Sequence, residues 1–135
     1  MVEMHIDYAG QLRCEAVHGP SGTRLHTDAP VDNHGRGESF SPTDLLATAL
    51  AGCVMTIMGI KAQSRSWDMT GARARVVKHM SDDLPRRIVR LELDVTLPAS
   101  LDEDQAEVLQ RVGLQCPVMQ SLHPDIVVEH RFQRG

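Results

Sequence analysis

The amino-acid sequence predicts an α+β protein with a single domain over residues 1–135. A length of 135 residues is typical of one domain. Residues 41–64 carry clear start signals for a helix, followed by apolar side chains at helical spacing. Residues 86–97 alternate between apolar and polar side chains, as an antiparallel strand with one solvent-exposed face requires. The strands and helices follow one another without an internal repeat, which favours an α+β arrangement.

The first 41 residues are expected to form strands followed by a long loop. Residues 4–8 and 11–17 alternate well enough to be strands, with Ala9 and Gly10 as a tight connection. Residues 23–27 are a candidate third strand within a polar stretch that is rich in Gly, Pro, Asp and Asn. Loops of this length in a compact domain often carry function.

The expected helix over residues 41–64 begins with the clearest local signals in the chain. Ser41 is an N-cap candidate, Pro42 occupies the first helical position, and Asp44 completes a capping-box pattern. Apolar side chains then cover much of the circumference, so we expect the helix to be buried on several sides. Small and hydroxyl residues interrupt the apolar stretch, which is therefore not expected to span a membrane. The two apolar stripes are Leu46, Ala49, Leu50, Cys53, Ile57 and Ile60, and Leu45, Ala49, Val54 and Met58.

The remaining residues are expected to form a hairpin, two helices and a closing strand. Ser100 and Glu103 make a second capping-box pattern at the start of one helix. Cys116 and Pro117 open the other helix, which is short. The predicted element order is therefore β-β-(β)-α-β-β-α-α-β. The expected ranges are 72–80 and 86–97 for the hairpin, about 100–114 and 117–123 for the helices, and 126–132 for the strand.

Composition argues against several functional classes. A formal net charge of −4 and an aromatic content of 3% give neither a basic face nor a stacking platform for nucleic acid. The N-terminal segment has no basic region followed by an apolar one, so we expect no export signal and a cytoplasmic location. Three cysteines, an odd number, argue against the disulfide framework of a secreted protein.

Two of the three cysteines occupy positions that suggest chemistry. Cys53 lies in the middle of the apolar helix, where a cysteine can also be a small core residue. Cys116 precedes Pro117 at the start of the short helix, where unpaired backbone N–H groups favour an anion and can lower the pKa of a thiol. A loop-ending cysteine without chemistry is an equally good interpretation of Cys116. Cys14 lies in an expected strand and is interpreted as a core or edge filler.

Together these cysteines and their neighbours resemble the paired signature of the OsmC/Ohr family. The first motif is Ser-Pro-Thr-Asp-Leu-Leu-Ala-Thr-Ala-Leu-Ala-Gly-Cys at residues 41–53, and the second is Cys-Pro-Val-Met at residues 116–119. The element order fits this family over nearly the whole chain, with more similarity to the less characterised OsmC-like branch than to Ohr proper. The resemblance implies strongly curved antiparallel sheets wrapped around long central helices in an intertwined homodimer, with both active sites at the subunit interface.

The resemblance also implies a reaction. Cys53 matches the cysteine that attacks an organic hydroperoxide and becomes a sulfenic acid, and Cys116 matches the one that converts it to a disulfide. A thiol or dithiol reductant then restores both thiols, in agreement with the order of thiol oxidation states. We therefore expect a thiol-dependent peroxidase of oxidative-stress defence, with no metal or other cofactor and no membrane partner. The alternative is a non-enzymatic OsmC-like protein that binds an apolar ligand in the interface pocket.

Two features depart from the peroxidase pattern of the family. Where the family has a Glu after the helix-start proline, this chain has Thr43, and Asp44 lies about 100° further around the helix. The family's Glu holds the activating Arg, so its absence leaves more than one arginine of this chain as a candidate for that role. Arg36 is our candidate, with Glu38 as its carboxylate partner, and Arg24 is the alternative. A solvated loop arginine is an equally good interpretation of Arg36.

Local electrostatics and the resemblance disagree on which thiol is reactive. Local electrostatics favours Cys116, which lies at a helix start. Cys53 lies at an apolar mid-helix position, where desolvation opposes thiolate formation unless a cation is close. The resemblance favours Cys53 as the attacking residue. We follow the resemblance, so the predicted catalytic residues are Cys53, Cys116 and Arg36.

Two other kinds of site compete with a thiol site. Seven histidines with three cysteines could bind zinc, but no short paired spacing of ligands occurs, so no metal site is expected. Stoichiometric zinc in the purified protein would contradict the thiol-enzyme interpretation. Cys116 and His123 could form a Cys–His hydrolase pair, but no oxyanion-hole motif accompanies them.

Overall fold

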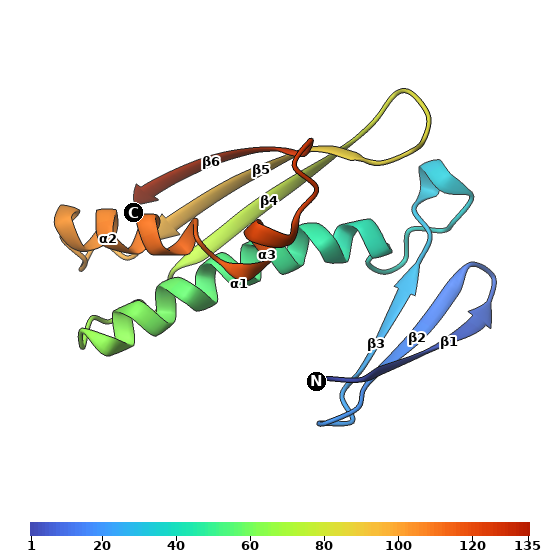
Figure 1. Ribbon diagram of the computed structural model, residues 1–135, viewed down its shortest axis with the longest axis horizontal. Helices are drawn as coiled ribbons and strands as arrows, with labels where there is room; N and C mark the ends of the chain where they lie inside the picture. Colours follow the sequence, from blue (N-terminus) through green and yellow to red (C-terminus); the bar gives the residue numbers. More distant parts are fainter. The chain divides into compact units, whose positions relative to one another are not determined.

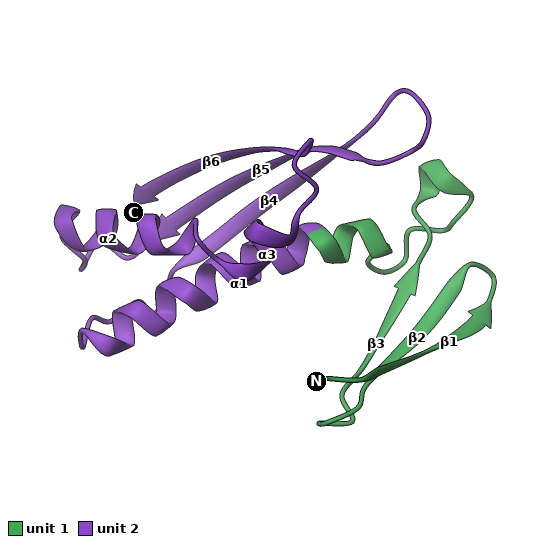
Figure 2. Cartoon of the chain, viewed as in Figure 1, with its two compact units in different colours: residues 1–46 green, residues 47–135 purple.

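The computed structural model describes all of residues 1–135 and divides into two compact units (Figure 1). Residues 1–46 make up the first unit and residues 47–135 the second (Figure 2). Each unit carries one three-stranded sheet. Apart from a short 3-10 helix, the element order is β-β-β-α-β-β-α-α-β, which confirms the α+β prediction. A single domain over residues 1–135 stays a prediction, because compactness and independent folding are different properties.

The first unit contains an antiparallel sheet in the order β1-β2-β3. The turn between the first two strands begins at Gly10, which has a φ of 87°, a conformation that glycine adopts without steric cost. The third strand confirms the candidate strand of the sequence, and a short 3-10 helix lies in the loop after it. The bounds are Met4–Gly10 for β1, Arg13–His18 for β2, Arg24–Asp28 for β3 and Val31–Asn33 for the 3-10 helix η1.

The long helix α1 (Pro42–Ser64) begins at the predicted residue. Asp44 N–H donates to Ser41 Oγ at 3.1 Å, and Ser41 N–H donates to the Asp44 carboxylate at 2.9 Å, which makes a reciprocal capping box. The buried side of the helix is narrower than predicted, since Leu46 and Ile60 are 39% and 60% exposed. An apolar surface that extends around most of a helix does not by itself select the face to be buried. The buried residues are Ala47, Leu50, Val54, Met58 and Ala62.

By length and composition alone, α1 is also apolar enough to cross a membrane. The most apolar window of 18 residues has a mean hydropathy of 1.8, and 28% of that window is buried. The small residues that interrupt the helix lower its hydropathy less than the sequence argument assumed. A helix from a protein core has the same properties, so this observation is weak evidence for a membrane span.

The second unit contains the sheet β4-β5-β6. The first two strands pair antiparallel, whereas β6 runs parallel to β5 and so differs from the expected antiparallel arrangement. The reason is the connection: the chain returns through two helices, which is the crossover that a parallel pair requires. The bounds are Arg73–Met80 for β4, Ile88–Leu97 for β5, Glu103–Gly113 for α2, Pro117–Ser121 for α3 and Val127–Arg134 for β6.

Helix α2 has its capping box two residues after the predicted position. Asp102 Oδ1 accepts from Gln105 N–H at 2.8 Å, and the Gln105 side chain accepts from Asp102 N–H at 2.9 Å. Ser and Asp are equally good N-cap residues, so the local sequence did not distinguish Ser100 from Asp102.

The hydrophobic core lies in the second unit. Alternate residues of β5 from Leu91 to Leu97 are at most 1% exposed, as the alternating pattern predicts. Val54 and Met58 of α1 are fully buried in the same core. Gly113 at the end of α2 permits close approach to α1, because a Cβ atom there would lie 2.8 Å from Met58 Cγ. The sheet and the helices thus hold both α1 and the start of α3 in fixed positions.

Candidate functional site

Cys53 lies in the part of α1 that belongs to the second unit. Its side chain is partly buried and packs against the hydrophobic core. Leu50, one turn before it, is fully buried, while Ala49 and Ile60 are exposed. Only part of the predicted apolar surroundings of this thiol is therefore formed, and the thiol lies at the edge of the core.

Cys116 is the N-cap of α3, as the sequence predicts. Its backbone is extended, Pro117 follows at the first helical position, and Met119 N–H donates to Cys116 Sγ at 3.4 Å. The residue is fully buried, with 0% of its surface exposed. The helix start therefore gives a hydrogen bond to a sulfur atom that water does not reach.

Burial raises the pKa of the Cys116 thiol above its usual value. The Met119 N–H group acts in the opposite direction, and the neighbouring Cys53 thiol raises the pKa further. The predicted lowering of the pKa of Cys116 is therefore wrong. Desolvation opposes the thiolate more strongly than the backbone N–H groups of a short helix favour it.

The two predicted active-site thiols lie next to each other. The Cys53 side chain lies close enough to the Cys116 thiol to raise its pKa, both pack against the same core, and both cysteines are free. One thiol comes from the middle of α1 and the other from the start of α3, so the packing of the second unit brings them together. Close approach of this kind is what disulfide formation between them requires. Cys14, in contrast, lies on β2 in the first unit.

The two arginines considered from the sequence lie in the first unit. Arg24, on β3, forms an ion pair with Glu15. Arg36 is exposed and has no hydrogen bond or ion pair. Glu38, the expected partner of Arg36, instead accepts from Arg13 Nη2 at 2.5 Å. The expected Arg36–Glu38 pair is therefore wrong, while the catalytic role of Arg36 stays a prediction.

The sequence did not predict the ion pairs of Arg13. Its Nη2 lies 2.5 Å from Glu38 Oε2 and 3.7 Å from Asp28 Oδ2, so two carboxylates hold one guanidinium group. The Asp28 side chain is only 2% exposed, and its Oδ1 atom has no hydrogen-bond partner. The sequence shows only an arginine at the start of a strand. Glu38 lies 25 residues further along the chain, and Asp28 lies on the neighbouring strand β3.

The competing hydrolase site does not form. His123 is 67% exposed on its side chain, and its Nδ1 accepts from Asp125 N–H at 3.1 Å. The Cys116 thiol is instead buried beside Met119 and Cys53. No group of three or more His, Cys, Asp or Glu side chains comes close enough to hold a metal ion.

The α+β fold and the paired thiols define a class of thiol proteins, and sequence comparison gives the family. A family profile described as OsmC-like protein matches residues 35–131, a range that contains both thiols. The chain therefore belongs to the OsmC family of OsmC-like proteins. None of the curated proteins matches this sequence.

Solved structures agree with this membership. A protein from Psychrobacter arcticus 273-4, described as a candidate osmotic stress induced and detoxification response protein, is 42% identical, with a TM-score of 0.90 and coverage of 100% of this chain and 96% of that one. The organic hydroperoxide resistance protein OsmC of Legionella pneumophila is 14% identical, with a TM-score of 0.75 and coverage of 100% and 96%. A hypothetical protein from Aquifex aeolicus VF5 is 10% identical, with a TM-score of 0.83 and the same coverage. The last two are similar in fold alone.

Proposed function

We propose that this protein is a thiol-dependent peroxidase that reduces small organic hydroperoxides in cytoplasmic oxidative-stress defence. The observation that carries the proposal is the proximity of the Cys53 and Cys116 side chains at the same core. Family membership supports it, since related structures include organic hydroperoxide resistance proteins.

The proposed cycle has three steps. The Cys53 thiolate attacks the outer peroxide oxygen, the O–O bond breaks, and the alkoxide leaves as an alcohol after taking a proton, so that Cys53 becomes a sulfenic acid. The Cys116 thiol then attacks the Cys53 sulfur, which forms a disulfide and releases water. A dithiol, or two molecules of a small thiol, reduces the disulfide and returns both thiols.

The different settings of the two thiols support this division of roles. A buried thiol with a raised pKa, such as Cys116, is a poor first nucleophile because the thiolate is the reactive form. It is well placed to attack a sulfenic acid that forms on its neighbour. Cys53 lies at the edge of the core, where an apolar hydroperoxide could reach it.

The attacking thiolate also needs a nearby positive charge. Arg36 is the candidate from the sequence, and Arg13 is a second one, because carboxylates hold its guanidinium as the family resemblance implies for the activating Arg. Arg36→Gln, Arg13→Gln and Arg24→Gln, the last at the alternative candidate from the sequence, separate these residues, with Arg111→Gln on the exposed side of α2 as the matched control. We expect substitution of the activating arginine to slow peroxide reduction by about a hundredfold. If all three candidate variants keep the wild-type rate, none of these arginines has this role.

We also propose a homodimer with active sites at the subunit interface. On the first sheet, Ile6, Ala16 and Leu25 are in register across the three strands, and Ile6 and Leu25 are 61% and 44% exposed. Exposed apolar surface of this kind is typical of an interface. A second copy of the chain would cover this apolar row and the exposed side of α1.

The alternative function is non-enzymatic binding of an apolar ligand at the proposed interface. The substitution of the family's Glu by Thr43 favours this alternative. It predicts that a hydroperoxide binds without chemical change at either thiol. The proximity of the two thiols favours the peroxidase, because a binding pocket needs no such pair.

Mass spectrometry after addition of one equivalent of cumene hydroperoxide tests the proposal. We expect a disulfide between Cys53 and Cys116 and one equivalent of the corresponding alcohol. The Cys14→Ser variant is the matched control and should give the same disulfide. Free thiols at both positions, with the hydroperoxide unconsumed, would reject the peroxidase and favour the binding protein.

A further inference from the structure

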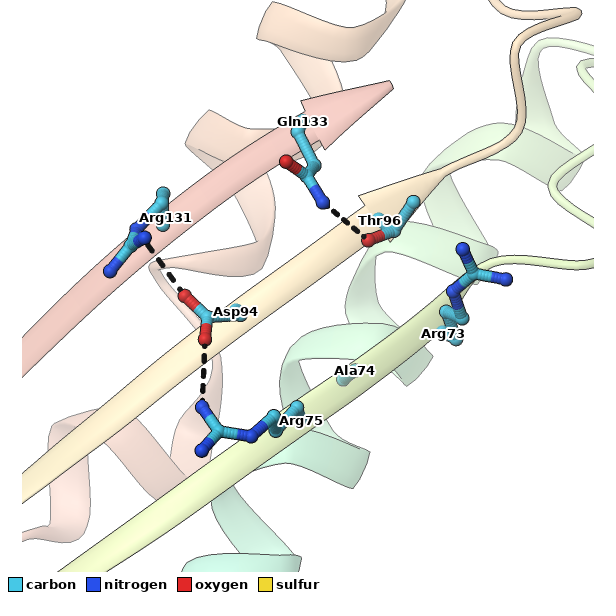
Figure 3. Close-up of a pocket in the computed structure, with 7 residues that line it drawn as sticks. All are labelled: Arg73, Ala74, Arg75, Asp94, Thr96, Arg131 and Gln133. Carbon is cyan, nitrogen blue, oxygen red and sulfur yellow. Dashed lines mark hydrogen bonds and ion pairs between the residues drawn. The ribbon is translucent and has the colours of Figure 1, made fainter. Parts of the chain in front are cut away.

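The face of the second sheet opposite the hydrophobic core carries a polar groove of about 360 Å³ (Figure 3). The groove lies wholly within the second unit, and no thiol lines it. Two neighbouring rows of side chains run across the three strands and form its floor and walls. In register, one row is Arg75, Asp94 and Arg131, and the next is Arg73, Thr96 and Gln133.

Asp94 holds the first row in place. Its Oδ2 atom accepts from Arg75 Nη1 at 3.2 Å, and its Oδ1 atom lies 3.4 Å from Arg131 Nε (Figure 3). One carboxylate thus fixes two guanidinium groups that come from the two flanking strands. The side chains of Arg75 and Arg131 remain 70% and 79% exposed. Since a guanidinium has five N–H donors, both can bind a further anion.

Arg73 adds a third guanidinium group to the groove. It is exposed and has neither a hydrogen bond nor an ion pair. The groove therefore contains three arginines and one aspartate, although the chain as a whole has a formal net charge of −4. A local positive potential on an acidic protein concentrates small anions at that place.

The second row offers groups of a different kind. Gln133 Nε2 donates to Thr96 Oγ1 at 3.2 Å (Figure 3). This bond leaves the Thr96 hydroxyl hydrogen and the Gln133 carbonyl oxygen free to bind hydroxyl groups of a ligand. The groove can therefore bind an anion and a neutral polar group side by side.

We propose that this groove binds a small ligand with a phosphate group. The phosphate would lie among Arg73, Arg75 and Arg131, because guanidinium groups bind phosphate oxygens in pairs and the net charge of the lining matches a dianion. The volume is at the lower end of the range for small-molecule sites. The charged lining is unsuited to an apolar hydroperoxide, so this site is independent of the proposed thiol chemistry.

Titration of the full-length ¹⁵N-labelled protein at constant ionic strength tests the proposal. The probes are inorganic phosphate, glycerol 3-phosphate, sulfate and succinate. We expect saturable amide shifts at Ala74, Asp94, Thr96 and Gln133 with both phosphates. Tighter binding of glycerol 3-phosphate than of inorganic phosphate identifies a phosphorylated metabolite as the ligand, and equal binding identifies free phosphate.

Arg73→Gln should weaken phosphate binding by about tenfold, the effect of one charge-assisted hydrogen bond. Arg111→Gln is the matched control, because Arg111 is exposed on α2, has no partner and carries the same charge. It should leave the affinity unchanged. The proposal is overturned if both variants weaken binding equally, if succinate or sulfate binds as tightly as phosphate, or if no shift saturates.

Discussion

The two units of the chain differ in what they bury. All thirteen buried apolar residues lie in residues 47–135, whereas the first unit buries only Thr27, Asp28 and Ser41, which are polar. Conversely, ten of the thirteen large exposed apolar side chains lie in residues 1–46. The second unit thus has a core of its own, and the first unit keeps its apolar side chains on its surface.

The two units also differ in what holds their polar and reactive side chains in place. The core of the second unit fixes both thiols, since α1 and the start of α3 pack against the same sheet. The first unit holds Arg13 between two carboxylates and leaves apolar side chains such as Ile6 and Leu25 exposed on its sheet. Burial therefore positions the thiols in one unit, and charge pairing positions the arginine in the other.

The largest expected effect is a loss of stability when the core of the second unit is disrupted. Leu93→Ala removes a fully buried side chain of β5, and we expect it to lower the free energy of unfolding by about 2–5 kcal/mol. Leu84→Ala, at a residue that is 88% exposed, should change it by less than about 0.5 kcal/mol. Urea denaturation measures both. Equal effects of the two substitutions would show that Leu93 is not part of a packed core.

The next effect concerns the apolar face of the first unit. Ile6→Ser should weaken self-association by at least about tenfold, because a partner would bury this side chain and about 1.5–3 kcal/mol would be lost. Leu84→Ser is the control with an exposed leucine outside that face. Sedimentation equilibrium gives the dimer dissociation constants. An unchanged constant for Ile6→Ser would exclude this face from the interface.

A smaller effect is expected at the buried carboxylate of the first unit. Asp28→Asn keeps the shape of the side chain but removes the charge that faces Arg13, at an expected cost of about 1–3 kcal/mol in local stability. Hydrogen exchange of the β3 amides measures this cost. Asp7→Asn is the control, since Asp7 is exposed on β1 without an ion pair. If both variants exchange like wild type, Asp28 does not hold the first unit together.

The smallest expected effect is the pH dependence of stability that the Cys116 thiol causes. Because the pKa of this thiol is raised in the folded state, the unfolded chain loses its proton first as the pH rises. Stability should therefore decrease above about pH 8.5, the usual pKa of a free thiol. Urea denaturation under reducing conditions should show a shallower decrease for Cys116→Ser. A steeper decrease in that variant would contradict the raised pKa.

Local signals predicted the order of the elements, the start of α1 and the buried face of β5. The capping residues around Ser41 and the alternation of residues 86–97 act over a few positions, so a single sequence suffices to find them. The pairing of Arg13 with Asp28 and Glu38 depends on how distant segments meet, which no local pattern encodes. The raised pKa of Cys116 could not be predicted either, because the sequence shows the helix start but not the burial of the thiol.

In the proposed cycle, Cys53 attacks the peroxide and Cys116 resolves the product. Trapping with dimedone after one equivalent of cumene hydroperoxide tests this division of roles on two variants. Cys116→Ser should accumulate a sulfenic acid that dimedone labels at Cys53, whereas Cys53→Ser should give no label at Cys116. Labelling of Cys116 in the second variant, with none on Cys53 in the first, would show that the two thiols have the opposite roles.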